Sequence, residues 1–188
     1  MANVLLGVTG SVAAIHTPDL VADLQQAGHV VKIVATRSAL YFFDPIPLCV
    51  IRDEDEWPGD RYQRGDPVLH IELRRWADLL LIAPCDANTL AKLALGLADN
   101  CLTCVYRAWE PSRPVLLAPA MNTLMWEHPA TARHLAQIAA DLGPSLRVVP
   151  PISKKLACDD VGVGAMASRE SICAACGFAL GESDREVS

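Results

Sequence analysis

Short, uninterrupted apolar segments alternate with longer amphipathic segments along most of the chain. Apolar runs of this length without alternating polar positions are typical of strands buried on both faces of a sheet. The amphipathic segments between them have the length and the end residues of helices. The pattern predicts strands at residues 4–8, 30–35, 79–83, 115–118 and about 147–149.

The helices are predicted from the residues that begin and end them. Pro18 lies near the first turn of the first helix and Gly28 ends it, whereas Asp66 and Pro67 are suited to begin VLHIELRRWA. Residues 38–43 are helix-like and residues 45–65 are irregular. The remaining helices are predicted after Asp86, from Asp99 to Trp109, at 129–142 and at 169–180, with a long loop at 150–167.

Buried strands that are each followed by a helix predict an α/β protein with a parallel sheet covered on both faces. We expect a single domain with a Rossmann-like (flavodoxin-like) doubly wound sheet and right-handed connections. The domain is assigned to residues 1–182, and residues 183–188 form a short polar tail. Ligands of such folds bind beyond the carboxyl ends of the strands, so the candidate chemistry is sought there.

Composition excludes several classes of protein. Apolar residues make up 52% of the 188 residues and charged residues 20%, which indicates a packed domain rather than disorder. The net charge is −6 and no basic stripe is present, so binding to nucleic acid is not expected. No apolar run is long enough to span a membrane. The first residues, MANVLLGVTG, do not resemble a signal peptide, and a cytoplasmic location is predicted.

The seven cysteines are an odd number in a chain expected to be cytosolic, so a disulfide framework is not expected. Two pairs have C-x-x-C spacing, Cys101/Cys104 and Cys173/Cys176, but both lie in apolar, helix-like segments. Core packing is therefore favoured over a four-thiolate zinc site, and no metal is predicted. Cys158 lies in the polar, glycine-rich segment KKLACDDVGVGAM and is the better candidate for chemistry.

Two segments that follow the first two strands are suited to a phosphate. GVTGS at residues 7–11 allows backbone N–H groups to approach a phosphate at a helix N-terminus, although it matches neither G-x-G-x-x-G nor the P-loop. Thr36, Arg37 and Ser38 stand where dinucleotide-binding folds usually place an acidic residue for the ribose. This favours a mononucleotide such as FMN over NAD, while an ordinary tight turn also explains the glycines.

Two asparagine-bearing segments follow the next two strands. Residues 84–89 (PCDANT) and 119–126 (PAMNTLMW) each begin with proline, and an asparagine can both donate and accept hydrogen bonds to a flavin edge or a carboxylate. Helix capping alone also explains either asparagine. His70 is a candidate base near neutral pH, although a lone helical histidine is more often structural. Surface or turn positions suffice for the other histidines.

Together these segments resemble a known family. GVTGSVAAI, DPVLHIELRRWADLLLIAP, the P-x-x-A-N-T and P-A-M-N-x-x-M-W motifs and KKLACDDVGVGAMA are similar to motifs of the homo-oligomeric flavin-containing cysteine decarboxylases. Among these, the similarity is to phosphopantothenoylcysteine decarboxylases, the coenzyme A biosynthesis enzymes. It extends from about Val4 to Ala167.

The resemblance implies a role for each matching residue. His70 would be the catalytic base, Asn122 and Met125 would contact the substrate, and Cys158, on a substrate clamp at about 151–167, would donate a proton in a final reductive step. The family further implies trimers or dodecamers with FMN at the subunit interface. The residues implied to bind FMN are Gly10, Ser11, Val12, Thr36, Ser38, Phe42, Asp86, Ala87, Asn88, Thr89 and Ala120.

The implied reaction explains the need for a flavin. Oxidation of the cysteine thiol to a thioaldehyde creates an electron sink, so CO2 can leave and an enethiolate remains. In the coenzyme A enzyme this product is then reduced to the saturated thiol. Asp159 stands where the family commonly has glycine, and the added carboxylate puts the substrate in doubt.

Several alternatives therefore stay open. Related enzymes act on the C-terminal cysteine of a ribosomal peptide (lanthipeptide, linaridin or thioamide peptide) and release the enethiol without reducing it. Cys158 favours the coenzyme A enzyme over these. A flavodoxin-like electron carrier would not need His70, Asn122 and a clamp cysteine together. A phosphatase-regulatory relative would carry a long acidic tail, and the His70 segment does not suit a flavin prenyltransferase.

Overall fold

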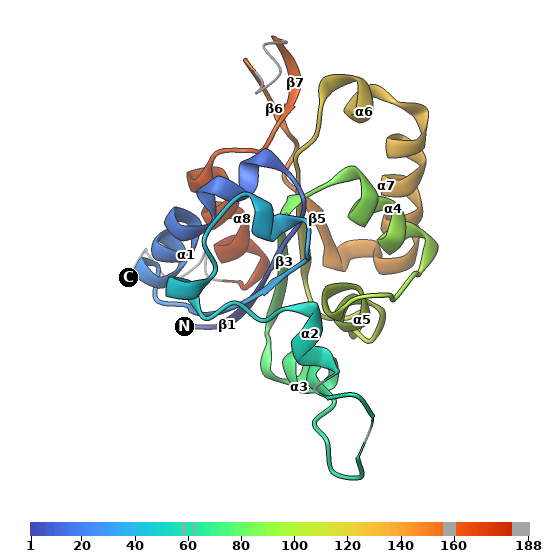
Figure 1. Ribbon diagram of the computed structural model, residues 1–188. Helices are drawn as coiled ribbons and strands as arrows, with labels where there is room; N and C mark the ends of the chain where they lie inside the picture. The colour runs from blue at the N-terminus through green and yellow to red at the C-terminus, as the bar shows by residue number, and fades with distance from the viewer. Residues whose placement is uncertain (58, 62, 156–160, 182–188) are drawn as a thin grey trace.

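A five-stranded parallel sheet forms the centre of the molecule in the computed structural model, which describes residues 1–57, 59–61, 63–155 and 161–181 (Figure 1). The strand order is β2-β1-β3-β4-β5, and every neighbouring pair is parallel. This confirms the predicted doubly wound α/β fold. The strands are β1 (Asn3–Val8), β2 (Val30–Ala35), β3 (Leu79–Cys85), β4 (Val115–Pro119) and β5 (Leu146–Val148).

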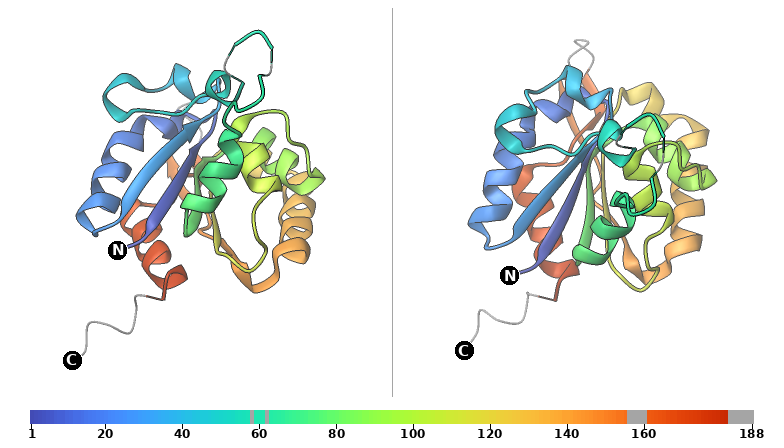
Figure 2. Two further views of the ribbon diagram at one scale, coloured as in Figure 1. Left: turned by 90° about the horizontal axis from the view of Figure 1, so that it is seen from below. Right: turned by 60° about the horizontal axis from the view of Figure 1, so that its bottom comes forward.

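Helices cover both faces of the sheet, and each face has its own apolar core (Figure 2). All seven residues of β3 are buried, and its alternate side chains point into opposite cores: Leu79 and Leu81 into one, Leu80 and Ile82 into the other. The first core is covered by α1 (Thr17–Gln26) and α8 (Arg169–Ala179). The second is covered by α3 (Leu69–Trp76), α4 (Ala87–Leu95), α5 (Cys101–Arg107) and α7 (Pro129–Leu142).

None of the helices in the described part of the chain is long and apolar enough to cross a membrane.

Shorter elements connect the sheet to these helices. The helix-like segment predicted at 38–43 contains only one 3-10 turn. The short elements are α2 (Asp53–Glu56), α6 (Thr123–Glu127), η1 (Val12–His16), η2 (Ala39–Tyr41), η3 (Ile46–Leu48) and η4 (Gly143–Ser145).

Two of the predicted helix starts are wrong. Asp66 does not cap α3, because its carboxylate accepts a hydrogen bond from Gln63 N at 2.6 Å in the preceding turn, and the helix begins at Leu69. Asp99 does not cap α5, because its carboxylate binds Lys92, and Asn100 takes the cap position instead. By contrast, Asp86 accepts a hydrogen bond from Thr89 N at 2.7 Å and caps α4 as predicted.

The predicted loop at 150–167 contains an antiparallel hairpin of β6 (Ile152–Lys155) and β7 (Val161–Ala165). The glycines of β7 made the segment read as a loop, but they are needed for packing. A Cβ at Gly162 would overlap Thr123, and one at Gly164 would overlap the carbonyl oxygen of Met121. The main chain of β7 therefore lies directly on the segment that follows β4, with Met121 N donating to Gly164 O at 2.9 Å.

Candidate active site

A cavity of about 720 Å³ lies beyond the carboxyl ends of β1, β3 and β4, where the fold predicts a ligand. Its walls come from η1, the start of α4, the segment 120–125, the hairpin and the start of α8. The structure thus gathers predicted site residues from four separate parts of the sequence. Those that line it are Gly10, Ser11, Val12, Phe42, Asp86, Ala87, Asn88, Ala120, Asn122 and Met125.

A second cavity of about 530 Å³ contains the remaining described residues predicted to bind the cofactor: Thr36, Ser38 and Thr89. Asn88 lines both cavities, so the two spaces meet at the N-terminal turn of α4. The other residues that line the second cavity are polar or charged: Arg37, Asp53, Lys92, Asp99 and Asn100.

The loops after β1 and β3 are joined by Thr9, a residue that the sequence analysis did not single out. Its side chain is fully buried. The Thr9 hydroxyl donates to the carbonyl of Pro84 at 2.8 Å and accepts from Asp86 N at 2.7 Å. Because a hydroxyl can donate and accept at once, this one side chain satisfies both groups. A threonine just before Gly10 was the only available sequence signal for this role.

Gly10 is the point at which three loops meet. A Cβ at this position would lie 2.5 Å from Ser38 Oγ and 3.2 Å from Asp86 Oδ2, closer than ordinary packing permits. The glycine therefore allows the loops after β1, β2 and β3 to surround one small space. Ser11, the next residue, accepts from Ala13 N at 3.4 Å and begins η1.

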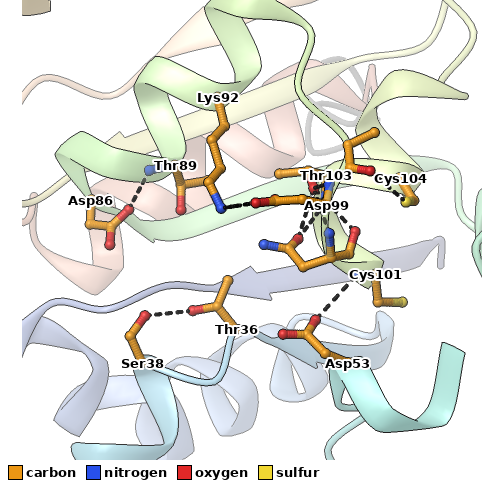
Figure 3. Close-up of polar contacts among 12 residues, drawn as sticks. Thr36, Ser38, Asp53, Asp86, Thr89, Lys92, Asp99, Cys101, Thr103 and Cys104 are labelled. Carbon is orange, nitrogen blue, oxygen red and sulfur yellow. Dashed lines mark hydrogen bonds and ion pairs between the residues drawn. The ribbon is translucent and has the colours of Figure 1, made fainter. Parts of the chain in front are cut away.

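Hydroxyl groups and an ion pair define the polar cavity (Figure 3). Thr36 Oγ1 and Ser38 Oγ lie 3.1 Å apart, while Lys92 Nζ binds both carboxylate oxygens of Asp99 at 2.7–2.8 Å. The hydrogen bond from Lys92 lowers the pKa of Asp99. Burial raises the pKa of Asp53. The charges of Lys92 and Asp99 offset each other, so Arg37, the hydroxyls and the main-chain N–H groups are the donors suited to an anion there.

Asn122 and Met125, the residues predicted to contact the substrate, line the larger cavity. Asn122 Oδ1 accepts from Leu124 N at 2.9 Å, so the side chain also caps α6, the alternative role considered from the sequence. The cap holds the amide in a fixed orientation beside the cavity. Met125 is 49% exposed in the single chain.

His70 does not line either cavity. It lies near the start of α3, where Glu56 of α2 contacts both its ring and its backbone N–H. Cys158 and Asp159 lie outside the described residues, although Ile152 and Gly164 of the hairpin that flanks them line the larger cavity. His16, for which the sequence suggested only a surface or turn role, lies in η1 and also lines this cavity. Its position shortly after the glycine turn at residues 7–11 was the sequence signal that could have placed His16 at the site.

The C-x-x-C pairs pack into the protein as predicted. Cys101 and Cys176 are buried, and burial raises the pKa of Cys101, Cys104 and Cys173, which keeps these thiols protonated at neutral pH. Among residues 1–57, 59–61, 63–155 and 161–181, no group of three or more His, Cys, Asp or Glu side chains is placed to hold a metal ion.

Comparison with known proteins gives the class of this chain. The Flavoprotein family model matches residues 1–177. Phosphopantothenoylcysteine decarboxylase from Mus musculus is 53% identical over 175 residues, which cover 92% of this chain and 84% of the relative. The chain therefore belongs to the flavoprotein family, in its group of phosphopantothenoylcysteine decarboxylases.

Solved structures agree with this assignment. A mutant PPC decarboxylase complexed with pantothenoylaminoethenethiol superposes with a TM-score of 0.87 at 48% identity, covering 97% of this chain and 99% of that one. The FMN binding protein AtHal3 superposes with a TM-score of 0.83 at 47% identity, covering 98% and 99%. The family resemblance drawn from the motifs is confirmed.

The junction at Thr9 leads to a stability prediction. Thr9→Val keeps the volume but leaves Asp86 N–H and the Pro84 carbonyl buried without their partner, at a cost of about 1–3 kcal/mol for each group. We expect the urea midpoint to fall accordingly. The control is Thr17→Val, at a buried threonine whose hydroxyl has no hydrogen-bond partner in the described structure. Equal midpoints for the two variants would show that the junction does not stabilise the fold.

Proposed function

We propose that the protein is an FMN-dependent decarboxylase that acts on 4′-phosphopantothenoylcysteine in coenzyme A biosynthesis. The observation that carries this proposal is the convergence of the glycine turn, the P-A-M-N segment and the hairpin on one cavity. These are the segments on which the family resemblance rests. They occur in a chain that is 53% identical to a phosphopantothenoylcysteine decarboxylase over most of its length.

The residues around the two cavities fit FMN. Gly10 brings the loops that carry Ser38 and Asp86 close together, because a Cβ at this position would lie 2.5 Å from Ser38 Oγ and 3.2 Å from Asp86 Oδ2. Thr36, Ser38 and Thr89 supply hydroxyls for the phosphate end. The larger cavity offers Phe42 and apolar neighbours for the ring. The residues that would hold FMN are Gly10, Ser11, Val12, Thr36, Ser38, Phe42, Asp86, Ala87, Asn88, Thr89 and Ala120.

Each remaining residue has a defined task in the reaction. When bound, FMN supplies the acceptor for the two electrons that leave the substrate as its thiol is oxidised to a thioaldehyde. His70 accepts the thiol proton in this step. Asn122, whose amide is fixed by the cap on α6, holds the substrate carboxylate until CO2 leaves. Cys158 donates the proton that accompanies reduction of the resulting enethiolate, and Met125 packs beside the substrate.

The position of His70 supports a homo-oligomer, a trimer or a dodecamer, with the active site between subunits. His70 does not line the cavity that contains Asn122, so the base would reach the substrate from a second copy of the chain. Exposed apolar side chains on the elements that line the cavity support the same arrangement. Val12, Ile15 and Leu124 are 46%, 50% and 76% exposed in the single chain, and a second copy would cover them.

The fit to FMN gives the first functional prediction. Gly10→Val should yield a folded protein that is colourless after purification, because the added side chain would overlap Ser38 and displace it from its proposed position beside the cofactor. Visible absorbance after reconstitution with FMN measures binding, and circular dichroism verifies the fold. A yellow Gly10→Val protein with full FMN content would contradict this placement of the cofactor.

The role of His70 gives the second functional prediction. His70→Asn should retain FMN but lose turnover by about 100-fold or more, the usual contribution of a positioned general base. The matched control is His134→Asn, a half-buried histidine on α7 that lines neither cavity. Turnover of His70→Asn at the wild-type rate would remove His70 from the mechanism.

The substrate is tested by mass spectrometry of two parallel reactions, one with 4′-phosphopantothenoylcysteine and one with a short peptide that ends in cysteine. We expect efficient loss of CO2 alone from the pantothenate substrate, because the reductive step returns the two hydrogens. Preferential loss of CO2 and two hydrogens from the peptide would instead identify a peptide-modifying oxidative decarboxylase.

A further inference from the structure

The Glu56 side chain is an acidic group buried beside the proposed catalytic base. It is the last residue of α2, and only 3% of its side chain is exposed, compared with 25% for His70. Figure 1 shows α2 next to α3, the helix that carries His70. Acidic side chains are rarely buried unless hydrogen-bond donors surround them. The donors around Glu56 therefore indicate what this carboxylate does.

His70 supplies two of these donors. Glu56 Oε2 accepts from the backbone N–H of His70 at 2.9 Å, and Glu56 Oε1 contacts the ring at Nδ1. The first bond satisfies an N–H in the opening turn of α3, which Asp66 does not cap. A third donor is the thiol of Cys101 on α5, which remains protonated because burial and the Glu56 carboxylate both raise its pKa.

The contact at Nδ1 determines the tautomer of the ring. An ionised carboxylate can only accept hydrogen bonds, so the proton of neutral His70 must lie on Nδ1. Nε2 is then the nitrogen with a lone pair for a substrate proton. Because the same carboxylate also holds the backbone N–H, the ring and the helix start are fixed together.

Docking of α2 does not by itself account for this carboxylate. Asp53, at the other end of the same short helix, already joins α2 to α5 by accepting from Cys101 N at 3.1 Å. An apolar side chain at position 56 would pack against α3 and α5 without the cost of burying a charge. The carboxylate is instead directed at His70.

We propose that Glu56 is a positioning residue for the reaction: it orients the His70 imidazole with Nε2 toward the substrate thiol. This rests on the proposed function, in which His70 is the base. When the thiol S–H bond breaks, the electron pair stays on sulfur and an N–H bond forms at Nε2. The ring becomes positively charged, and the adjacent Glu56 carboxylate offsets that charge without changing its own protonation.

The test uses Glu56→Gln in the FMN-loaded full-length protein. Glutamine has the same shape but lacks the charge and offers one acceptor oxygen in place of two. We expect kcat to fall about 10- to 100-fold, the range typical of partners that orient metal-binding histidines, with KM and FMN content unchanged. The matched control, Glu54→Gln, removes one charge from the exposed side of the same helix and should leave kcat unchanged.

A spectroscopic readout separates positioning from a purely structural role. In 15N-labelled protein, the imidazole nitrogen shifts should show a single Nδ1–H tautomer for His70 in the wild type and in Glu54→Gln. In Glu56→Gln the spectrum should show a mixture of tautomers. If Glu56→Gln does not fold, Glu56→Asp replaces it, because its shorter carboxylate should lose the contact with Nδ1 and reduce kcat in the same way.

The outcomes distinguish this inference from the proposed function. If His70→Asn turns over at the wild-type rate, the base assignment fails and the inference fails with it. If His70→Asn is inactive while the Glu56 variant keeps wild-type kcat and a single tautomer, only the role of Glu56 is overturned. Loss of kcat with unchanged KM and a mixed tautomer supports the inference.

Discussion

The active site depends on the buried hydroxyl of Thr9. Parallel strands end at the same edge of the sheet, but their loops have no backbone ladder to hold them together beyond that edge. Thr9 supplies this connection by bonding the carbonyl of Pro84 and the N–H of Asp86 at once. Gly10 can then lie between Ser38 and Asp86, and α4 begins at a fixed point beside it.

The site is divided into two spaces of different character that meet at Asn88. The smaller space is lined by hydroxyls and charged side chains, whereas the larger one includes apolar side chains such as Phe42 and Met125. A mononucleotide has a charged phosphate end, which suits the smaller space, and a large aromatic end, which suits the larger one. The core strands contribute almost nothing to either space directly, so the chemistry resides in the loops while the buried strands determine their positions.

The sequence predicted most of the fold because β1, β3 and β4 are buried on both faces, which leaves a continuous apolar run for each. It also predicted the Asp86 cap and ten of the residues that line the larger cavity. The hairpin was missed because Gly162 and Gly164 serve close packing rather than a turn. The contact of Glu56 with His70 joins two helices across an irregular segment, and no local pattern encodes such a contact.

Part of the contact between the hairpin and the rest of the site is made by main chain, because Gly164 leaves no side chain between β7 and Met121. One wall of the cavity is therefore held by a hydrogen bond that does not depend on which side chains surround it. This contact is separate from the ladder bonds of the five-stranded sheet, because β6 and β7 form a sheet of their own. The hairpin wall of the cavity and the central sheet are thus held by separate interactions, so the local stability of the wall need not follow the stability of the core.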